Sequence, residues 1–303
     1  GLCLDVSGGG ELAIARAVDF PAERVFMHGN NKTPRELREA IQAGVGRIII
    51  DSRIELKRIS EIAGELGVVQ PIYMRITPGV EADTHQYIRT GCEDSKFGFT
   101  MRDDFAYGCV KDVLAAPNVR LAGLHCHIGS QIFALHSYPE AVEVMVDLMA
   151  RIEQEYGYRI EELDVGGGLG IAYTADDKPA SIDEFAETVT SAVHAACEKF
   201  GVPEPRLLTE PGRSLVATAG VTLYTVGILK TLPGIRKYVA VDGACPTTSA
   251  RRCTTPITSR SSRTRRVSRA PRSSPSRQAL RKRRRRGIDN ADAHPTWATS
   301  SPS

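Results

Sequence analysis

The chain has 303 residues, of which 42% are hydrophobic and 25% are charged, a composition typical of a globular protein with one large or two smaller domains. Its net charge of +3 is the sum of two unlike parts: the chain before Ala244 is acidic, and the chain from Ala244 onward is strongly basic. The basic part includes the run Arg281–Arg286. The seven cysteines are odd in number and show no paired spacing, which argues against a disulfide framework and for a reducing, cytoplasmic location. The chain also lacks an apolar run of the roughly 20 residues that a membrane span needs, so we expect no membrane partner.

Short apolar runs alternate with amphipathic helical patterns along most of the chain. Capping residues mark three helix starts: Thr33 with Glu36, Ser52 with Glu55, and Ser181. The strand-like runs are Gly1–Val6, Arg24–Gly29, Arg47–Ser52, Pro71–Ile76, Leu121–Ser130, Glu162–Gly170 and Arg206–Ser214. About seven strand–helix units in succession predict a parallel sheet wrapped by helices.

We interpret this pattern as an α/β fold, a parallel (β/α)8 barrel over residues 1–220. Such barrels have eight strands in roughly 250 residues, so the first strand is expected to lie upstream of Gly1. A doubly wound open sheet is the alternative. Residues 221–243 alternate without an intervening helix and predict the start of a β-rich C-terminal domain.

Two glycine-containing loops follow neighbouring predicted strands and point to anion binding. The loop Asp164–Gly170 contains three consecutive glycines, whose backbone N–H groups can converge on a phosphate. In Thr209–Ser214, Gly212 and Arg213 offer N–H and guanidinium donors beside the Glu210 carboxylate. Each loop alone also fits a simple turn, but two of them at the carboxyl ends of barrel strands predict a phosphate site.

His125 and His127 are two residues apart and would share one face of a strand, which raises the possibility of a metal site. Structural zinc normally takes four ligands, and no further ligand is spaced to join these two. We therefore expect no metal. An imidazole lying against a bound aromatic cofactor, with Ser130 donating to its phosphate, fits the neighbouring loops better.

Several stretches, taken together and in order, resemble one enzyme family. They are "DVSGGGEL", "HGNNK", "RITPGVEADTHQYI", "KFGF", "GLHCHIGSQI", "DVGGGLGI" and "TEPGRSLVATAG". The combination is similar to the diaminopimelate decarboxylases, pyridoxal 5′-phosphate enzymes that convert meso-2,6-diaminopimelate to L-lysine and CO2. The motifs "HIGSQI" and "GGGLGI" favour this family over the related ornithine decarboxylases, and a decarboxylase of another basic amino acid is the alternative.

The resemblance implies an eight-stranded α/β barrel, a β-sandwich domain and a homodimer with shared active sites. It also implies which residues bind the cofactor: Asp5, Arg75, His127, Ser130, Gly167, Gly168, Glu210, Pro211, Gly212 and Arg213. Glu210 would keep the ring nitrogen protonated, so that the ring can accept the electrons left when CO2 departs. His127 would stack on the ring, and Arg213 would also touch the substrate.

The resemblance assigns no catalytic residue to this chain. The family's cofactor-attaching lysine lies on its first barrel strand, which is expected upstream of Gly1, and Lys32 lies outside that motif. The family's proton-donating cysteine, with its glutamate, belongs to the β domain beyond Gly243. We therefore expect the chain as written to bind the cofactor phosphate without decarboxylating diaminopimelate.

The sequence after Gly243 departs from the family abruptly. The family continues Val-Asp-Gly-Gly with Met-Ser-Asp-Asn, whereas this chain continues Val241–Gly243 with Ala-Cys-Pro-Thr. A legal back-translation from Gly243, GGC GCA TGT CCG ACA ACA, spells Met-Ser-Asp-Asn when the frame is shifted by one base. We interpret residues 244–303 as an out-of-frame basic tail with too little apolar surface to fold.

Two further alternatives concern the whole protein. The tail could be a basic arm that binds nucleic acid, but Trp297 is its single aromatic residue and it has no RNA-binding signature. We therefore expect no nucleic-acid partner. The chain could also be a non-catalytic, cofactor-binding relative that regulates an active enzyme by pairing with it.

Overall fold

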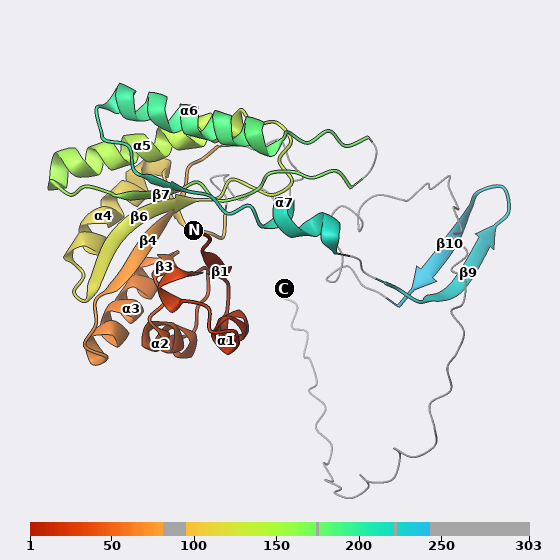
Figure 1. Cartoon of the computed structure of the whole chain (residues 1–303), viewed down its shortest axis with the longest axis horizontal. Coiled ribbons are helices and arrows are strands. Elements are labelled where there is room, and N and C mark those ends of the chain that lie inside the picture. The colour runs from red at the N-terminus through yellow and green to blue at the C-terminus, as the bar shows by residue number, and fades with distance from the viewer. Residues whose placement is uncertain (81–94, 174–175, 221–222, 243–303) are drawn as a thin grey trace, which may run out of the picture. The chain divides into compact units, whose positions relative to one another are not determined.

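The structure is a computed structural model that describes residues 1–80, 95–173, 176–220 and 223–242 (Figure 1). The basic tail predicted for residues 244–303 lies outside the described residues, as does the second half of the motif "RITPGVEADTHQYI", from Glu81 onward.

Seven parallel strands form one sheet in the order β1-β2-β3-β4-β6-β7-β8. Their bounds are β1 Leu4–Val6, β2 Val25–Met27, β3 Arg47–Ile50, β4 Gln70–Thr77, β6 Val119–Cys126, β7 Glu162–Asp164 and β8 Arg206–Leu208. The short strand β5 (Phe99–Thr100) pairs with the end of β4. Because the order along the sheet follows the chain without a reversal, the doubly wound alternative is wrong.

The sheet is curled into a partial barrel. In a flat sheet, β2 and β8 would lie five strand spacings apart, or about 24 Å. Instead, His28, which follows β2, lies 3.1 Å from the carboxylate of Glu210, which follows β8. The predicted (β/α) barrel is therefore confirmed for the strands described.

Helices alternate with the strands as the pattern predicted. They are α1 Gly9–Ala17, α2 Pro34–Ala43, α3 Arg53–Glu65, α4 Phe105–Ala115, α5 Ser137–Tyr156, α6 Ile182–Phe200 and the short α7 Gly212–Val216, with 3-10 turns at Ala22–Arg24, Arg102–Asp104 and Ala217–Ala219. Helices α5 and α6 lie side by side (Figure 1). No helix within the described ranges is both long and apolar enough to cross a bilayer.

Each face of the sheet has its own apolar cluster, because side chains alternate along a strand. The large cluster joins strand residues such as Ile48 and Met74 to the buried faces of the helices. The small cluster consists of Phe26, Ile49, Tyr73 and Ala122, with Leu208 against it. We assign this second cluster to the barrel interior, where the phenol of Tyr73 is completely buried.

Two of the three predicted helix caps form as expected. Thr33 and Glu36 make a reciprocal capping box, and Ser181 accepts a hydrogen bond from Glu184 N in the same way. The third is only half formed. Ser52 Oγ accepts from Glu55 N, but the Glu55 carboxylate accepts from Asp51 N and pairs with Lys32.

A two-stranded antiparallel hairpin, β9 Val226–Leu232 and β10 Arg236–Val241, follows the helical part. Its turn closes with a hydrogen bond from Ile235 N to Leu232 O, next to Gly234 at φ 71°. The expected change from strand–helix alternation to strands without an intervening helix is therefore confirmed. An isolated hairpin is marginally stable, so this one is suited to be part of a larger sheet.

Candidate functional site

Strand register lines up polar residues near the carboxyl edge of the sheet. Arg75 on β4 lies opposite His125 on β6, and His125 lies opposite Asp164 on β7. Asp164 in turn pairs with Leu208 on β8, two residues before Glu210. Parallel strands thus bring residues from four chain segments to one level of the barrel.

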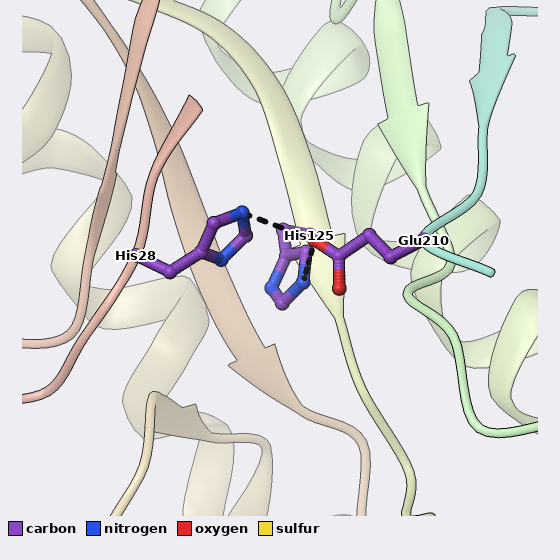
Figure 2. A group of neighbouring side chains, drawn as sticks. All are labelled: His28, His125 and Glu210. Carbon is purple, nitrogen blue, oxygen red and sulfur yellow. Dashed lines mark ion pairs between the residues drawn. The ribbon is translucent and has the colours of Figure 1, made fainter. Parts of the chain in front are cut away.

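Glu210 and two histidines form the centre of the site (Figure 2). The Nε2 atoms of His28 and His125 each lie 3.1 Å from the same carboxylate oxygen, Glu210 Oε1. The two imidazole rings approach edge to face, with centroids 5.2 Å apart. Asp5 Oδ1 lies 3.6 Å from His28 Nε2 and adds a second negative charge on that side.

The surroundings of Glu210 keep it ionised. Burial alone would raise the pKa of its carboxyl group, but His125 and His28 outweigh this effect and hold the pKa below its usual range. For His28, burial would lower the pKa, yet Glu210 and Asp5 outweigh it and raise the pKa. Burial is the largest effect at His125 and lowers its pKa, although Glu210 acts in the opposite direction.

The glycine loop Asp164–Gly170 packs directly against the backbone of Glu210. Glu210 N donates to Gly166 O at 2.9 Å, and a Cβ atom at Gly167 would come within 2.0 Å of the Glu210 carbonyl oxygen. Gly167 N itself donates to His127 Nδ1 at 3.3 Å, so binding a phosphate there would require this bond to be exchanged. Gly168 has φ 109°, a conformation that favours glycine.

Arg213 and Ser130 meet from loops that are far apart in sequence. Arg213 Nη2 donates to Ser130 Oγ at 2.9 Å, and Arg213 Nη1 donates to the Tyr173 hydroxyl. Pro211 is the residue before α7, and Gly212 N donates to Glu210 O at 2.9 Å. The structure therefore brings together a guanidinium and a hydroxyl, the groups expected at a phosphate.

The remaining predicted residues lie around this centre. His127 follows the end of β6, and burial lowers its pKa to about 4, so the imidazole is neutral at neutral pH. Arg75 is buried, with its guanidinium 4.3 Å from the centre of the Phe97 ring. Burial lowers the pKa of Arg75, while the charges of Asp51 and Glu210 act in the opposite direction.

The pairing of histidines differs from the sequence expectation. The sequence predicts His125 and His127 on one face of a strand, whereas the structure sets His125 against His28, and His127 lies beyond the last residue of β6. His28 lies at the end of a predicted strand, where barrel enzymes carry their chemistry, but no motif assigns it a specific role. Its contact with Glu210 depends on the curvature of the sheet, which local sequence does not show.

Asp164, the first residue of the glycine loop, is a second residue to which no motif assigns a role of its own. Its Oδ1 accepts from Gly166 N at 2.9 Å, which ties β7 to the glycine loop. Burial and the neighbouring Glu210 charge raise the pKa of Asp164 well above its ordinary value. Of these two carboxyl groups, Glu210 is therefore the stronger acid.

Comparison with known proteins decides the family. Residues 1–217 match the family described as "Pyridoxal-dependent decarboxylase, pyridoxal binding domain". This chain belongs to that family. The family's cofactor is pyridoxal phosphate, as the sequence predicted.

The most similar relatives include diaminopimelate decarboxylases. The chain is 45% identical over 243 residues to the enzyme of Bacillus subtilis strain 168, covering 80% of this chain and 55% of that protein. It is 46% identical over 244 residues to that of Actinosynnema pretiosum, covering 80% of this chain and 54% of the relative. The chain thus spans about half the length of the curated relatives that it matches.

Solved structures that superimpose on this chain also include diaminopimelate decarboxylases. The diaminopimelate decarboxylase of M. jannaschii, in co-complex with L-lysine, superimposes with a TM-score of 0.69 at 36% identity, over 78% of this chain and 54% of that one. The enzyme of Helicobacter pylori, complexed with L-lysine, gives a TM-score of 0.68 at 27% identity, over 80% of this chain and 58% of that one. The partial barrel is therefore the fold of this enzyme class.

The residues present fit pyridoxal phosphate by their chemistry. Glu210 Oε1 and Arg213 Nε are buried polar atoms without a hydrogen-bond partner among the described residues. The Glu210 carboxylate suits a protonated ring nitrogen, and the Arg213 guanidinium suits a phosphate. His28, His125 and Glu210 also make a possible metal donor set, with ligand atoms within 4.8 Å of one another. A metal bound there would take the place of the proton that Glu210 and Asp5 favour on His28.

Proposed function

We propose that this chain is the cofactor-binding part of a diaminopimelate decarboxylase, which converts meso-2,6-diaminopimelate to L-lysine and CO2. The observation that carries the proposal is that the Glu210 carboxylate, with His28 and His125 each at 3.1 Å, and the Arg213–Ser130 pair both lie in loops that follow the carboxyl ends of barrel strands. The names of the relatives support the choice of substrate.

Bound pyridoxal phosphate supplies an acceptor for the electron pair that CO2 leaves on the substrate α-carbon. Glu210 holds a proton at the ring nitrogen, because a carboxylate beside that nitrogen stabilises its positive charge. Arg213 and Ser130, with Gly168 and Gly212 of the two glycine loops, bind the phosphate. His127 lies against the ring as a neutral imidazole. Asp5 and Arg75 would support the face of the ring and its substituents.

We also propose the oligomeric state, the cellular location and the domain organisation of the complete enzyme. The complete protein is a cytoplasmic homodimer with shared active sites that binds neither nucleic acid nor membrane. Residues 1–220 are its pyridoxal-phosphate barrel domain, residues 221–243 begin its β-sandwich domain, and residues 244–303 are out of frame. Arg213 also contacts the substrate. The support is the resemblance in motifs "GLHCHIGSQI" and "TEPGRSLVATAG" and the break in that resemblance after Gly243.

The direct test measures CO2 release and lysine formation from meso-diaminopimelate. Two proteins are compared: this chain, and a version with the family's first strand added and the family's reading frame restored after Gly243. We expect turnover in the second and none in the first, because no residue of the first matches the family's cofactor-attaching lysine. An inactive second protein would contradict the assignment.

The same assay separates the alternatives. Lysine and ornithine are offered to the restored protein in place of diaminopimelate. Faster CO2 release from either of them would point to a decarboxylase of another basic amino acid. Cofactor binding without turnover of any of the three would favour the non-catalytic relative.

A further inference from the structure

The contacts of Glu210 are divided unevenly between its two oxygens. His28, which follows β2, and His125, on β6, both approach Oε1. Neither approach is aligned well enough for a hydrogen bond, although both separations are 3.1 Å. Figure 2 shows both ion pairs meeting at the same oxygen of the Glu210 carboxylate, while the second oxygen takes no part in them. The second oxygen, Oε2, is therefore the one available to a ring nitrogen.

Both histidines are built into the site. The His125 side chain is 1% exposed and the His28 side chain 12% exposed, against 17% for Glu210. His125 lies on β6 between Arg75 and Asp164 in the strand register, so its backbone position is fixed by the sheet. His28 N donates to Val6 O at 2.7 Å, which fixes the loop after β2. Groups that are buried and anchored in this way can hold a carboxylate in one orientation at little entropic cost.

We propose that His28 and His125 are positioning residues of the cofactor site, which hold Glu210 as a carboxylate with Oε2 directed at the ring nitrogen of the cofactor. The inference rests on the proposed cofactor site and goes beyond it, because it assigns two residues that touch Glu210 and not the cofactor. Small rotations of the two rings convert the 3.1 Å approaches into charge-assisted hydrogen bonds.

A purely structural role for the histidines is the competing explanation, and a pair of ligands distinguishes the two. The first is pyridoxine 5′-phosphate, which has the cofactor's ring and phosphate but no aldehyde, so that it does not react with surface lysines. The second is its 1-deaza analogue, in which a C–H group replaces the ring nitrogen. Affinity is measured by titration of the full chain, and the absorbance of the bound ring reports whether its nitrogen is protonated.

The variants are His28→Leu and His125→Leu, with Glu210→Gln as the reference and His125→Gln to restore one N–H donor. His194→Leu is the matched control, since His194 pairs with Glu204 at the surface of α6. Loss of a charge-assisted hydrogen bond corresponds to about a tenfold loss of affinity. We expect this loss for pyridoxine phosphate in both leucine variants, together with loss of the protonated-ring absorbance. Affinity for the deaza analogue should stay within about twofold, and His125→Gln should recover part of the loss.

The other possible outcomes would contradict either the positioning role of the histidines or the proposed cofactor site. Equal losses for both ligands would show that the histidines only support the fold, and unchanged affinities would show that they have no role. If the unaltered chain binds both ligands equally well, Glu210 does not read the ring nitrogen and the inference fails. If the unaltered chain binds neither ligand, the proposed cofactor site itself is wrong.

Discussion

At the scale of single residues, buried charges are held by specific partners. Lys32 Nζ donates to Gly29 O at 2.5 Å and to Ile49 O at 2.7 Å. It also pairs with Glu55 Oε1 at 3.0 Å. The Lys32 side chain is 1% exposed and that of Glu55 is 7% exposed. These contacts link the loop after β2 to β3 and α3, and they give Lys32 a structural role of its own.

We expect Lys32→Met to destabilise the protein strongly. The substitution leaves the Glu55 carboxylate buried without its cation, and breaking a buried pair from one side costs about 3–5 kcal/mol. Chemical denaturation gives the free energy of unfolding. The matched control is Lys57→Met on α3, whose exposed pair with Glu61 should contribute about 0–1 kcal/mol. Similar losses in the two variants would show that the Lys32 contacts are not a stabilising pair.

At the scale of secondary-structure elements, the glycine loop after β7 is shaped by the loop after β8. A Cβ atom at Gly167 would meet the backbone carbonyl of Glu210 at 2.0 Å, and one at Gly166 would meet Cys126 O at 2.4 Å. Backbone atoms cannot move aside as the end of a side chain can. The glycines therefore allow two neighbouring loops to pack directly against each other, which sets the position of Glu210.

We expect Gly167→Ala to displace Glu210 and weaken pyridoxine phosphate binding by at least tenfold. Overpacking of this kind also costs about 1–3 kcal/mol of stability. Gly108→Ala is the control, because nothing lies within 4 Å of a Cβ atom at this position in α4. Alanine there should raise the stability of the helix by up to about 1 kcal/mol. Unchanged ligand binding in Gly167→Ala would mean that the loop does not set the geometry of the site.

Local sequence predicted the elements well and the cross-strand contacts poorly. The capping boxes at Thr33 and Ser181 depend on residues three positions apart, and both form. The box at Ser52 forms only in part because Lys32, a distant residue, pairs with the Glu55 carboxylate. The contact of His28 with Glu210 likewise requires the sheet to close, and no local pattern reports sheet closure.

At the scale of the whole barrel, the two ends of the strands have different roles. Glu162, the first residue of β7, pairs with Arg47 at the start of β3 and Arg206 at the start of β8. Tyr73 donates to Glu162 Oε2 at 2.6 Å from inside the barrel. This ion network lies at the amino ends of the strands, whereas Glu210 and the glycine loops follow the carboxyl ends. In barrels of this kind the amino end serves stability and the carboxyl end serves chemistry.

We therefore expect Glu162→Gln to lower stability without changing ligand binding by the folded protein. Removing the charge leaves the part-buried Arg47 guanidinium without its counterion, at a cost of about 3 kcal/mol near pH 7. Burial would raise the pKa of Glu162, but Arg47 and Tyr73 outweigh it and lower the pKa. The stability that this carboxylate adds is thus present above its unfolded pKa of about 4.3 and is lost as the pH falls through the folded value.

The difference in unfolding free energy between the unaltered chain and Glu162→Gln should accordingly be constant from pH 7 to 5 and shrink below about pH 4. Glu153→Gln is the control, since Glu153 makes an exposed pair with Arg159, and it should cost under about 1 kcal/mol at every pH. Affinity for pyridoxine phosphate, measured where both proteins are folded, should agree within about twofold. A loss of affinity larger than that would show that the two ends of the barrel are coupled, and a pH-independent difference would show that the charge of Glu162 is not what stabilises the sheet.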